Sequence, residues 1–111
     1  MRSGFYFVMC ASMDRIEYLA KVTEIVAELT DVSPEEILGN SRSADIVDAR
    51  WITIRLLKDR GYSSKSIAPL IGRPQRSINH ALCCLDDRMQ YTNPEIGKTL
   101  AKARKLLGNN A

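Results

Sequence analysis

The sequence predicts an all-α protein, a helical bundle that contains a helix-turn-helix. Leu, Ile and Ala are plentiful, Gly and Pro are sparse, and only seven residues are aromatic, a bias that favours helices over strands. Apolar residues recur at helical spacing in several segments that begin at capping residues and end at glycines. The 111 residues, 45% of them hydrophobic, fit one domain with one core.

The first predicted helix covers residues 14–30. Asp14 is its expected N-cap, and Glu17 follows three residues later. The expected buried face consists of Ile16, Leu19, Ala20, Val26 and Ala27, widened by Val22 and Leu29.

A short second helix is predicted over residues 34–38. Ser33, Pro34 and Glu36 form a capping box with proline at the first helical position. Gly39 and Asn40 end the helix, and a polar connector that carries Arg42 follows.

Residues 46–60, "IVDARWITIRLLKDR", are predicted to form a helix that Gly61 ends. Its β-branched "WITI" stretch also suits a strand, but the longer helical frame and the basic last turn favour the helix. The expected buried face uses Ile46 or Val47, Trp51, Ile54, Leu57 and Leu56.

Two further helices form a helix-turn-helix over about residues 63–90. Ser63 or Ser64 caps "SKSIAPLIG", which is about two turns long and contains Pro69. Gly72 supplies a turn with positive φ. The next helix starts near Pro74, which needs no hydrogen bond there. Its apolar face is Ile78, Ala81, Leu82, Leu85 and Met89.

The last predicted helix runs from about Pro94 to Leu107, with Asn93 as its cap and Gly108 after it. We expect residues 14–111 to form a single helical domain and residues 1–13 to be an N-terminal extension of unknown role. No apolar run reaches the roughly 18 residues that span a membrane.

Charge is divided unevenly along the chain, whose net charge is +3. Residues 14–40 hold seven acidic residues against two basic ones, whereas residues 41–111 hold thirteen basic residues against six acidic ones. The basic part indicates a polyanionic partner, and the acidic part offers a surface for a protein partner or a homodimer. Three cysteines, Cys10, Cys83 and Cys84, fit a reducing cytoplasm better than a disulfide scaffold.

The N-terminus of a second helix in a helix-turn-helix enters the DNA major groove. Gln75, Arg76 and Ser77 occupy that end here. Arg can bind guanine and Gln can bind adenine in bidentate fashion, and Ser77 with free backbone N–H groups can hold a phosphate. His80 lies on the same face, opposite Ile78.

From residue 21 to residue 89 the chain resembles the C-terminal DNA-binding domain of the bacterial replication initiator DnaA. The likeness lies in four stretches that occur in the family's order and nearly its spacing: "EEILGNSR", "IVDARWITIRLL", "SSKSIA" and "GRPQRSINHA". The resemblance implies an all-α fold, similar also to the tryptophan repressor, and double-stranded DNA as the partner.

The resemblance also implies site residues. Arg42 falls on the family's basic minor-groove loop, Arg50 on a base or phosphate contact, and Lys58 on a phosphate contact. Arg73, Ser77 and His80 match positions of the family's signature motif. That motif has Asp-His and then Ser or Thr where this chain has Pro74, Gln75 and Arg76, so we expect a different base preference.

Other chemistry finds little support in the sequence. "IGKTL" at residues 96–100 lacks the first glycine of a phosphate loop, and the initiator's nucleotide-binding domain has no counterpart here, so we expect neither nucleotide binding nor ATPase activity. One histidine is too few for a zinc site with the cysteines. Asp86 and Asp87 point about 100° apart, which argues against an enzyme; we expect no cofactor and no metal.

Three functions remain open at this stage. The favoured one is a sequence-specific DNA-binding protein that acts as a regulator or a replication accessory. The second is a protein-interaction module on the same fold that has lost DNA binding. The third is a dimeric transcription regulator resembling the tryptophan repressor.

Overall fold

The computed structural model describes residues 15–108, and within this range it is all-α, as predicted. The helices are α2 (Arg15–Thr30), α3 (Pro34–Leu38), α4 (Ala44–Asp59), α5 (Ser64–Ile71), α6 (Gln75–Asp87) and α7 (Glu95–Leu107), with a π-helical turn at Arg88–Thr92 between the last two. No strand occurs among these residues. The N-terminal extension 1–13 and the expected cap Asp14 lie outside the described range.

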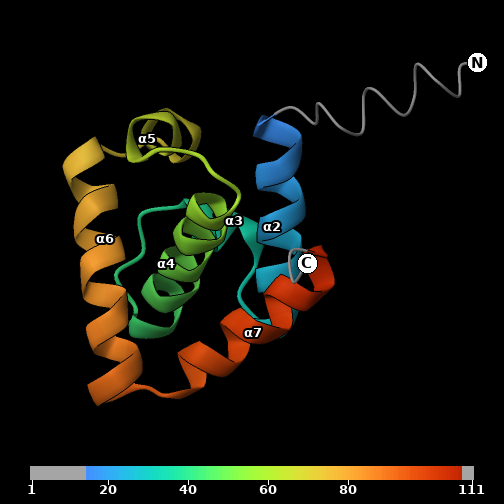
Figure 1. The fold of residues 1–111 in the computed structure, drawn as a ribbon, viewed down its shortest axis with the longest axis vertical. Helices are drawn as coiled ribbons and strands as arrows, with labels where there is room; N and C mark the ends of the chain where they lie inside the picture. The colour runs from blue at the N-terminus through green and yellow to red at the C-terminus, as the bar shows by residue number, and fades with distance from the viewer. Residues whose placement is uncertain (1–14, 109–111) are drawn as a thin grey trace, which may run out of the picture.

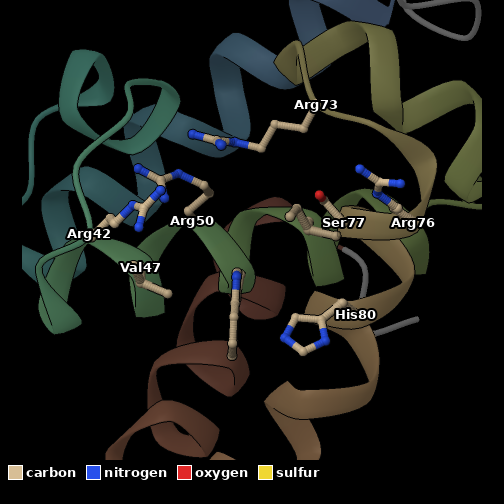
Figure 2. A pocket seen from close by; sticks show the side chains of 9 residues that line it. Arg42, Val47, Arg50, Arg73, Arg76, Ser77 and His80 are labelled. Atoms are coloured by element: carbon tan, nitrogen blue, oxygen red, sulfur yellow. The ribbon is translucent and has the colours of Figure 1, made fainter.

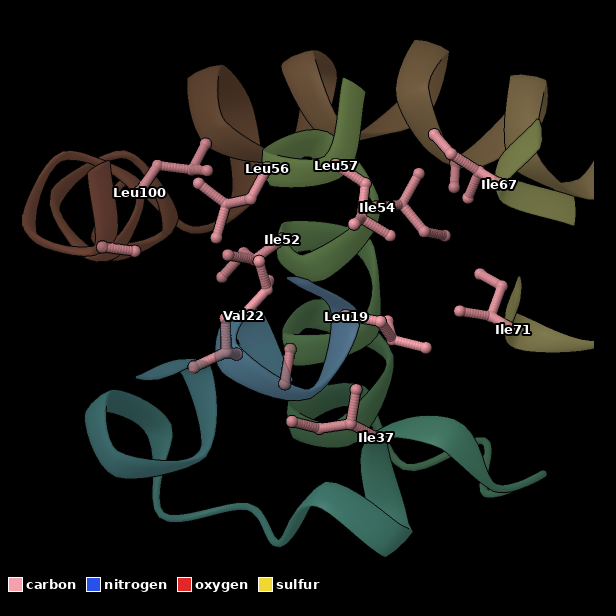
Figure 3. Close-up of a cluster of buried hydrophobic side chains, with 14 of the residues drawn as sticks. Leu19, Val22, Ile37, Ile52, Ile54, Leu56, Leu57, Ile67, Ile71 and Leu100 are labelled. Atoms are coloured by element: carbon pink, nitrogen blue, oxygen red, sulfur yellow. The ribbon is translucent and has the colours of Figure 1, made fainter. Parts of the chain in front are cut away.

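Helix α4 forms the centre of the bundle (Figure 1) and contacts α2, α3, α5, α6 and α7. Its large apolar side chains point to several sides (Figure 3), because neighbouring residues on a helix are 100° apart. The fully buried ones are Ile52, Ile54, Leu56 and Leu57.

The buried residues of α4 agree only in part with the predicted buried face. The helix is confirmed over the strand alternative, and it begins at Ala44, two residues before the predicted start. Ile54, Leu56 and Leu57 are buried as expected, but Ile46, Val47 and Trp51 are only partly buried. Ile52 and Thr53 are also buried, although neither was in the predicted face, because α4 is covered on several sides by its neighbours.

The buried face of α2 is as predicted at Leu19, Val22 and Val26 but differs at Ile16 and Ala20. Ile16 is 66% exposed and Ala20 is also exposed. The side chains that pack inward are Tyr18, Leu19, Val22, Thr23 and Val26. This face lies between α4 and α7, and its polar groups are accommodated: the Tyr18 ring packs at 4.8 Å from the Arg60 guanidinium, and Thr23 donates to the Ala20 carbonyl.

The capping box of α3 is present as predicted. Ser33 Oγ accepts a hydrogen bond from the Glu36 N–H, and Glu36 Oε1 accepts one from the Ser33 N–H. Pro34 starts the helix and Gly39 ends it. Ile37 is fully buried under α4, so this single turn anchors the connector that follows.

Helices α5 and α6 form the predicted helix-turn-helix. Ser63 caps α5, and Gly72 after it adopts a left-handed conformation with φ of 66°. Ile78 is fully buried between the helices, in line with its predicted place. Pro69 is accommodated because α5 has only eight residues. Pro74 is the N-cap of α6, with ψ of 151°, and not its first helical residue.

Helix α7 closes the bundle against α2 and α4. Asn93 Oδ1 accepts the Glu95 N–H, and Gly108 ends the helix with φ of 74°. The "IGKTL" stretch lies inside α7 with Ile96 and Leu100 in the core, so it forms no phosphate loop. Among the described residues, no helix is long and apolar enough to cross a bilayer.

Candidate nucleic-acid interface

A cleft of about 800 Å³ separates the connector after α3 from the start of α6. Figure 2 shows its walls: the connector and α4 on one side, the turn before α6 and α6 itself on the other. None of the described residues that line it is acidic, and four of the nine are arginines. The lining residues are Arg42, Val47, Arg50, Trp51, Ile54, Arg73, Arg76, Ser77 and His80.

Arg50 lies at the closed end of this cleft and is 7% exposed. Its guanidinium donates to the carbonyl of Ile37 at 2.7 Å, to that of Ser41 at 3.1 Å and to that of Glu36 at 3.4 Å. Burial and the charge of Arg73 lower the pKa of the Arg50 guanidinium. Arg50 therefore holds the last turn of α3 and the connector in place, an internal role that the sequence did not suggest.

Arg73 extends from the turn before α6 toward Arg42 and Arg50 (Figure 2). One of its terminal nitrogens donates to the Gly39 carbonyl, and its Nε is buried with no hydrogen-bond partner among the described residues. Arg50 and Arg73 thus bring two positive charges together against the same loop. Such a pair attracts an anion, because like charges in a partly desolvated site repel each other.

The first turn of α6 is open to a ligand. Pro74 offers no side chain to cap it, and the Pro74 carbonyl accepts only the N–H groups of Ser77 and Ile78. The N–H groups of Gln75 and Arg76 are thus left for an anion at the positive end of the helix. Both side chains are exposed, and Arg76 forms no ion pair with any residue in 15–108.

His80 faces the cleft one turn further along α6. Its ring meets the Trp51 ring edge to face, with centroids 6.0 Å apart and planes at 86°. On its own helix, His80 Nε2 lies 3.5 Å from Cys84 Sγ. No group of three or more His, Cys, Asp or Glu side chains that could hold a metal ion occurs in residues 15–108.

The structure brings together most of the predicted site residues. Arg42, Arg50, Arg73, Arg76, Ser77 and His80 line the cleft, and Gln75 is exposed at its edge. Lys58 is exposed in the last turn of α4 and does not line the cleft.

The apolar floor of the cleft, formed by Val47, Trp51 and Ile54, was not predicted from the sequence. Val47 and Trp51 were assigned to the core, yet they are only partly buried and line the cleft with Arg50; Ile54 is in the core as predicted and also borders the cleft. A signal existed, since positions 47, 50, 51 and 54 share one face of a helix, and an arginine on that face marks it as partly polar.

Comparison with known proteins agrees with this geometry. A family model described as the bacterial DnaA protein helix-turn-helix matches residues 19–83, more than half of the chain. The chain is also 26% identical, over 101 residues, to the chromosomal replication initiator protein DnaA of Kosmotoga olearia. That match covers 90% of this chain but 23% of the initiator. No solved structure gives a significant match. The chain therefore belongs to the family of bacterial DnaA helix-turn-helix domains.

Proposed function

We propose that this chain binds double-stranded DNA in a sequence-specific manner, as a regulator or an accessory of replication in the cytoplasm. The observation that carries the proposal is the arginine-lined cleft beside the uncapped, exposed start of α6. Family membership supports the same function. The proposal involves no nucleotide, cofactor, metal or catalytic step.

In this proposal the first turn of α6 enters the major groove. Arg76 reads guanine through its O6 and N7 atoms, and Gln75 reads adenine through N6 and N7. Ser77 and the free N–H groups of the first turn hold a backbone phosphate. His80 contacts the groove wall one turn further along α6.

Arg42 is the exposed cation on the opposite side of the cleft. We propose that it reaches the neighbouring minor groove or its phosphates, while Arg50 and Arg73 fix its loop relative to α6. Lys58 adds a phosphate contact at the periphery. Affinity then depends on several phosphate contacts, and each one lowers log K by about 0.9 per tenfold rise in salt.

Selection of bound duplexes from a random pool tests the proposal. We expect an enriched sequence that contains at least one guanine, and binding that weakens steeply with salt. A pool that stays random would contradict specific recognition, and no binding at low salt would contradict DNA binding altogether.

A protein-interaction role is the second candidate, favoured by the acidic surface of α2. Glu24 and Glu28 on α2 and Asp31 directly after it are exposed. We propose that this surface receives a basic partner or a second copy of the chain. Gel filtration at low and high salt tests self-association, because contacts between charged surfaces weaken as salt screens them.

A further inference from the structure

The floor of the cleft has a composition that duplex binding leaves unexplained. Val47, Trp51 and Ile54 form its apolar and aromatic part beside Arg42, Arg50, Arg73 and Arg76, and Ile54, at 1% exposed, adds little accessible surface. In the proposed function, the contacts to DNA come from exposed cations, His80 and the first turn of α6, and none comes from these three side chains. The floor then has no role, although it includes the only tryptophan of the chain.

A regular duplex that enters the cleft with its backbone first cannot use such a floor. Its bases are stacked inside, and the surface that enters a cleft is a charged phosphate backbone. Burying phosphate against apolar side chains costs free energy. A base that has left the stack fits better, because its flat face can stack on an aromatic ring while its flanking phosphates bind the guanidinium groups.

The geometry of the Trp51–His80 pair is compatible with stacking of a base. In an edge-to-face pair, the edge of one ring covers one face of the other and leaves the remaining faces open. Trp51 and His80 form such a pair, and His80 is exposed on the cleft side (Figure 2). The volume of about 800 Å³ lies in the range of roughly 300–1,000 Å³ that small-molecule sites have, which is ample for one nucleotide.

We propose that the cleft is a site for one unpaired nucleotide of DNA, whose base stacks at the Trp51–His80 pair while the arginines hold its phosphates. The inference rests on the proposed function, since α6 and Arg42 bring the DNA to the cleft. It goes beyond that function in the form of DNA preferred: a duplex with an unpaired base, not a fully paired one.

The test compares two labelled 20-base-pair duplexes of the same sequence, one of which carries a single-nucleotide bulge at its centre. Fluorescence anisotropy gives both affinities for the full chain. Stacking of one base on an aromatic side chain is worth about 1–3 kcal/mol, so we expect binding to the bulged duplex to be about 5- to 150-fold tighter. The tryptophan emission, which reports on Trp51 alone, should be quenched more by the bulged duplex.

Variants assign the effect to the cleft. Trp51→Leu is expected to reduce the affinity for the bulged duplex to that for the paired one. Tyr91→Leu is the matched control, because Tyr91 is 76% exposed and does not line the cleft; this variant should keep the preference. A thermal melt of each variant checks that it is folded.

The outcomes separate the two proposals. Equal affinity and equal quenching for both duplexes would overturn the unpaired-base site and leave duplex binding intact. A preference that survives in folded Trp51→Leu protein would also overturn it. Binding to neither duplex would overturn both proposals.

Discussion

The Nε atom of Arg50 donates a hydrogen bond of 2.7 Å to the carbonyl oxygen of Ile37, which ties the centre of the bundle to α3. A terminal nitrogen of the same guanidinium donates to Ser41 in the loop that carries Arg42. Lysine at position 50 would keep the charge but lose the planar fork that serves three carbonyl groups. We expect Arg50→Lys to lower the free energy of unfolding by about 1–3 kcal/mol, because buried acceptors lose their donors. Urea unfolding measures this.

Arg42→Lys is the control for that variant. Arg42 is exposed, and exposed substitutions away from special features change stability by less than about 0.5 kcal/mol. Equal stability of the two variants would show that the carbonyl contacts of Arg50 do not hold the loop.

Two glycine substitutions are expected to change the free energy of unfolding in opposite directions. Gly72 has a φ of 66° at the turn of the helix-turn-helix, and a Cβ there meets no atom within 4 Å. Gly72→Ala should therefore cost about 1–2 kcal/mol from backbone strain alone. Gly97 lies within α7, and its added Cβ would meet Met89 Sδ at an ordinary 3.8 Å. Gly97→Ala should stabilise by about 0.4–1 kcal/mol.

Thermal unfolding of both glycine variants gives the comparison. A stabilising Gly72→Ala change would mean that the turn adopts another conformation in solution.

Arg76→Ala and Lys58→Ala should affect DNA binding in different ways. Removing Arg76 should cost about 1–3 kcal/mol of discrimination at one base pair, whereas removing Lys58 should weaken all sequences alike and reduce the salt slope by about 1. Competition between the selected duplex and its single-base variants, repeated across a salt series, measures both quantities. If Arg76→Ala leaves discrimination unchanged, α6 does not read bases through this side chain.

The ion pair between Arg88 and Asp48 is expected to lock the end of α6 to α4. Arg88 Nε and a terminal nitrogen lie 2.6 and 3.0 Å from the two oxygens of Asp48, and this hydrogen bonding raises the pKa of Arg88. Because Asp48 is buried, Asp48→Asn should cost about 1.5–3 kcal/mol. A double-mutant cycle with Arg88→Met isolates the pair, and a coupling near zero would rule out the lock.

Most of the fold could be predicted because its signals are local. The capping box at Ser33, the glycine at position 72 and the apolar spacing of α6 each fix structure within a few residues. The buried face of α2 was predicted correctly at Leu19, Val22 and Val26 but wrongly at Ile16 and Ala20, since periodicity shows that a helix has an apolar side but not which neighbours cover it. Here α4 and α7 together select Tyr18 and Thr23 and leave Ile16 outside.

The positions of the candidate site's side chains could be predicted from the sequence where the side chains are exposed, but not where they are buried. Arg76 is outward because it opens a helix behind a proline. Arg50 turns inward because it donates hydrogen bonds to carbonyl groups of a segment that is distant in the sequence. Contacts between residues thirteen positions apart depend on the tertiary structure, which local patterns do not predict. The π-helical turn at Arg88–Thr92 likewise had no signal in the sequence.

The central position of α4 makes the helix-turn-helix of residues 63–90 dependent on the rest of the bundle. Ile67, Ile78 and Leu85 are covered by a helix from outside residues 63–90, so a peptide of that length would have no core of its own. Amide protons of α4 should exchange only when the whole molecule opens. Transferring the helix-turn-helix to another protein therefore means transferring the entire bundle.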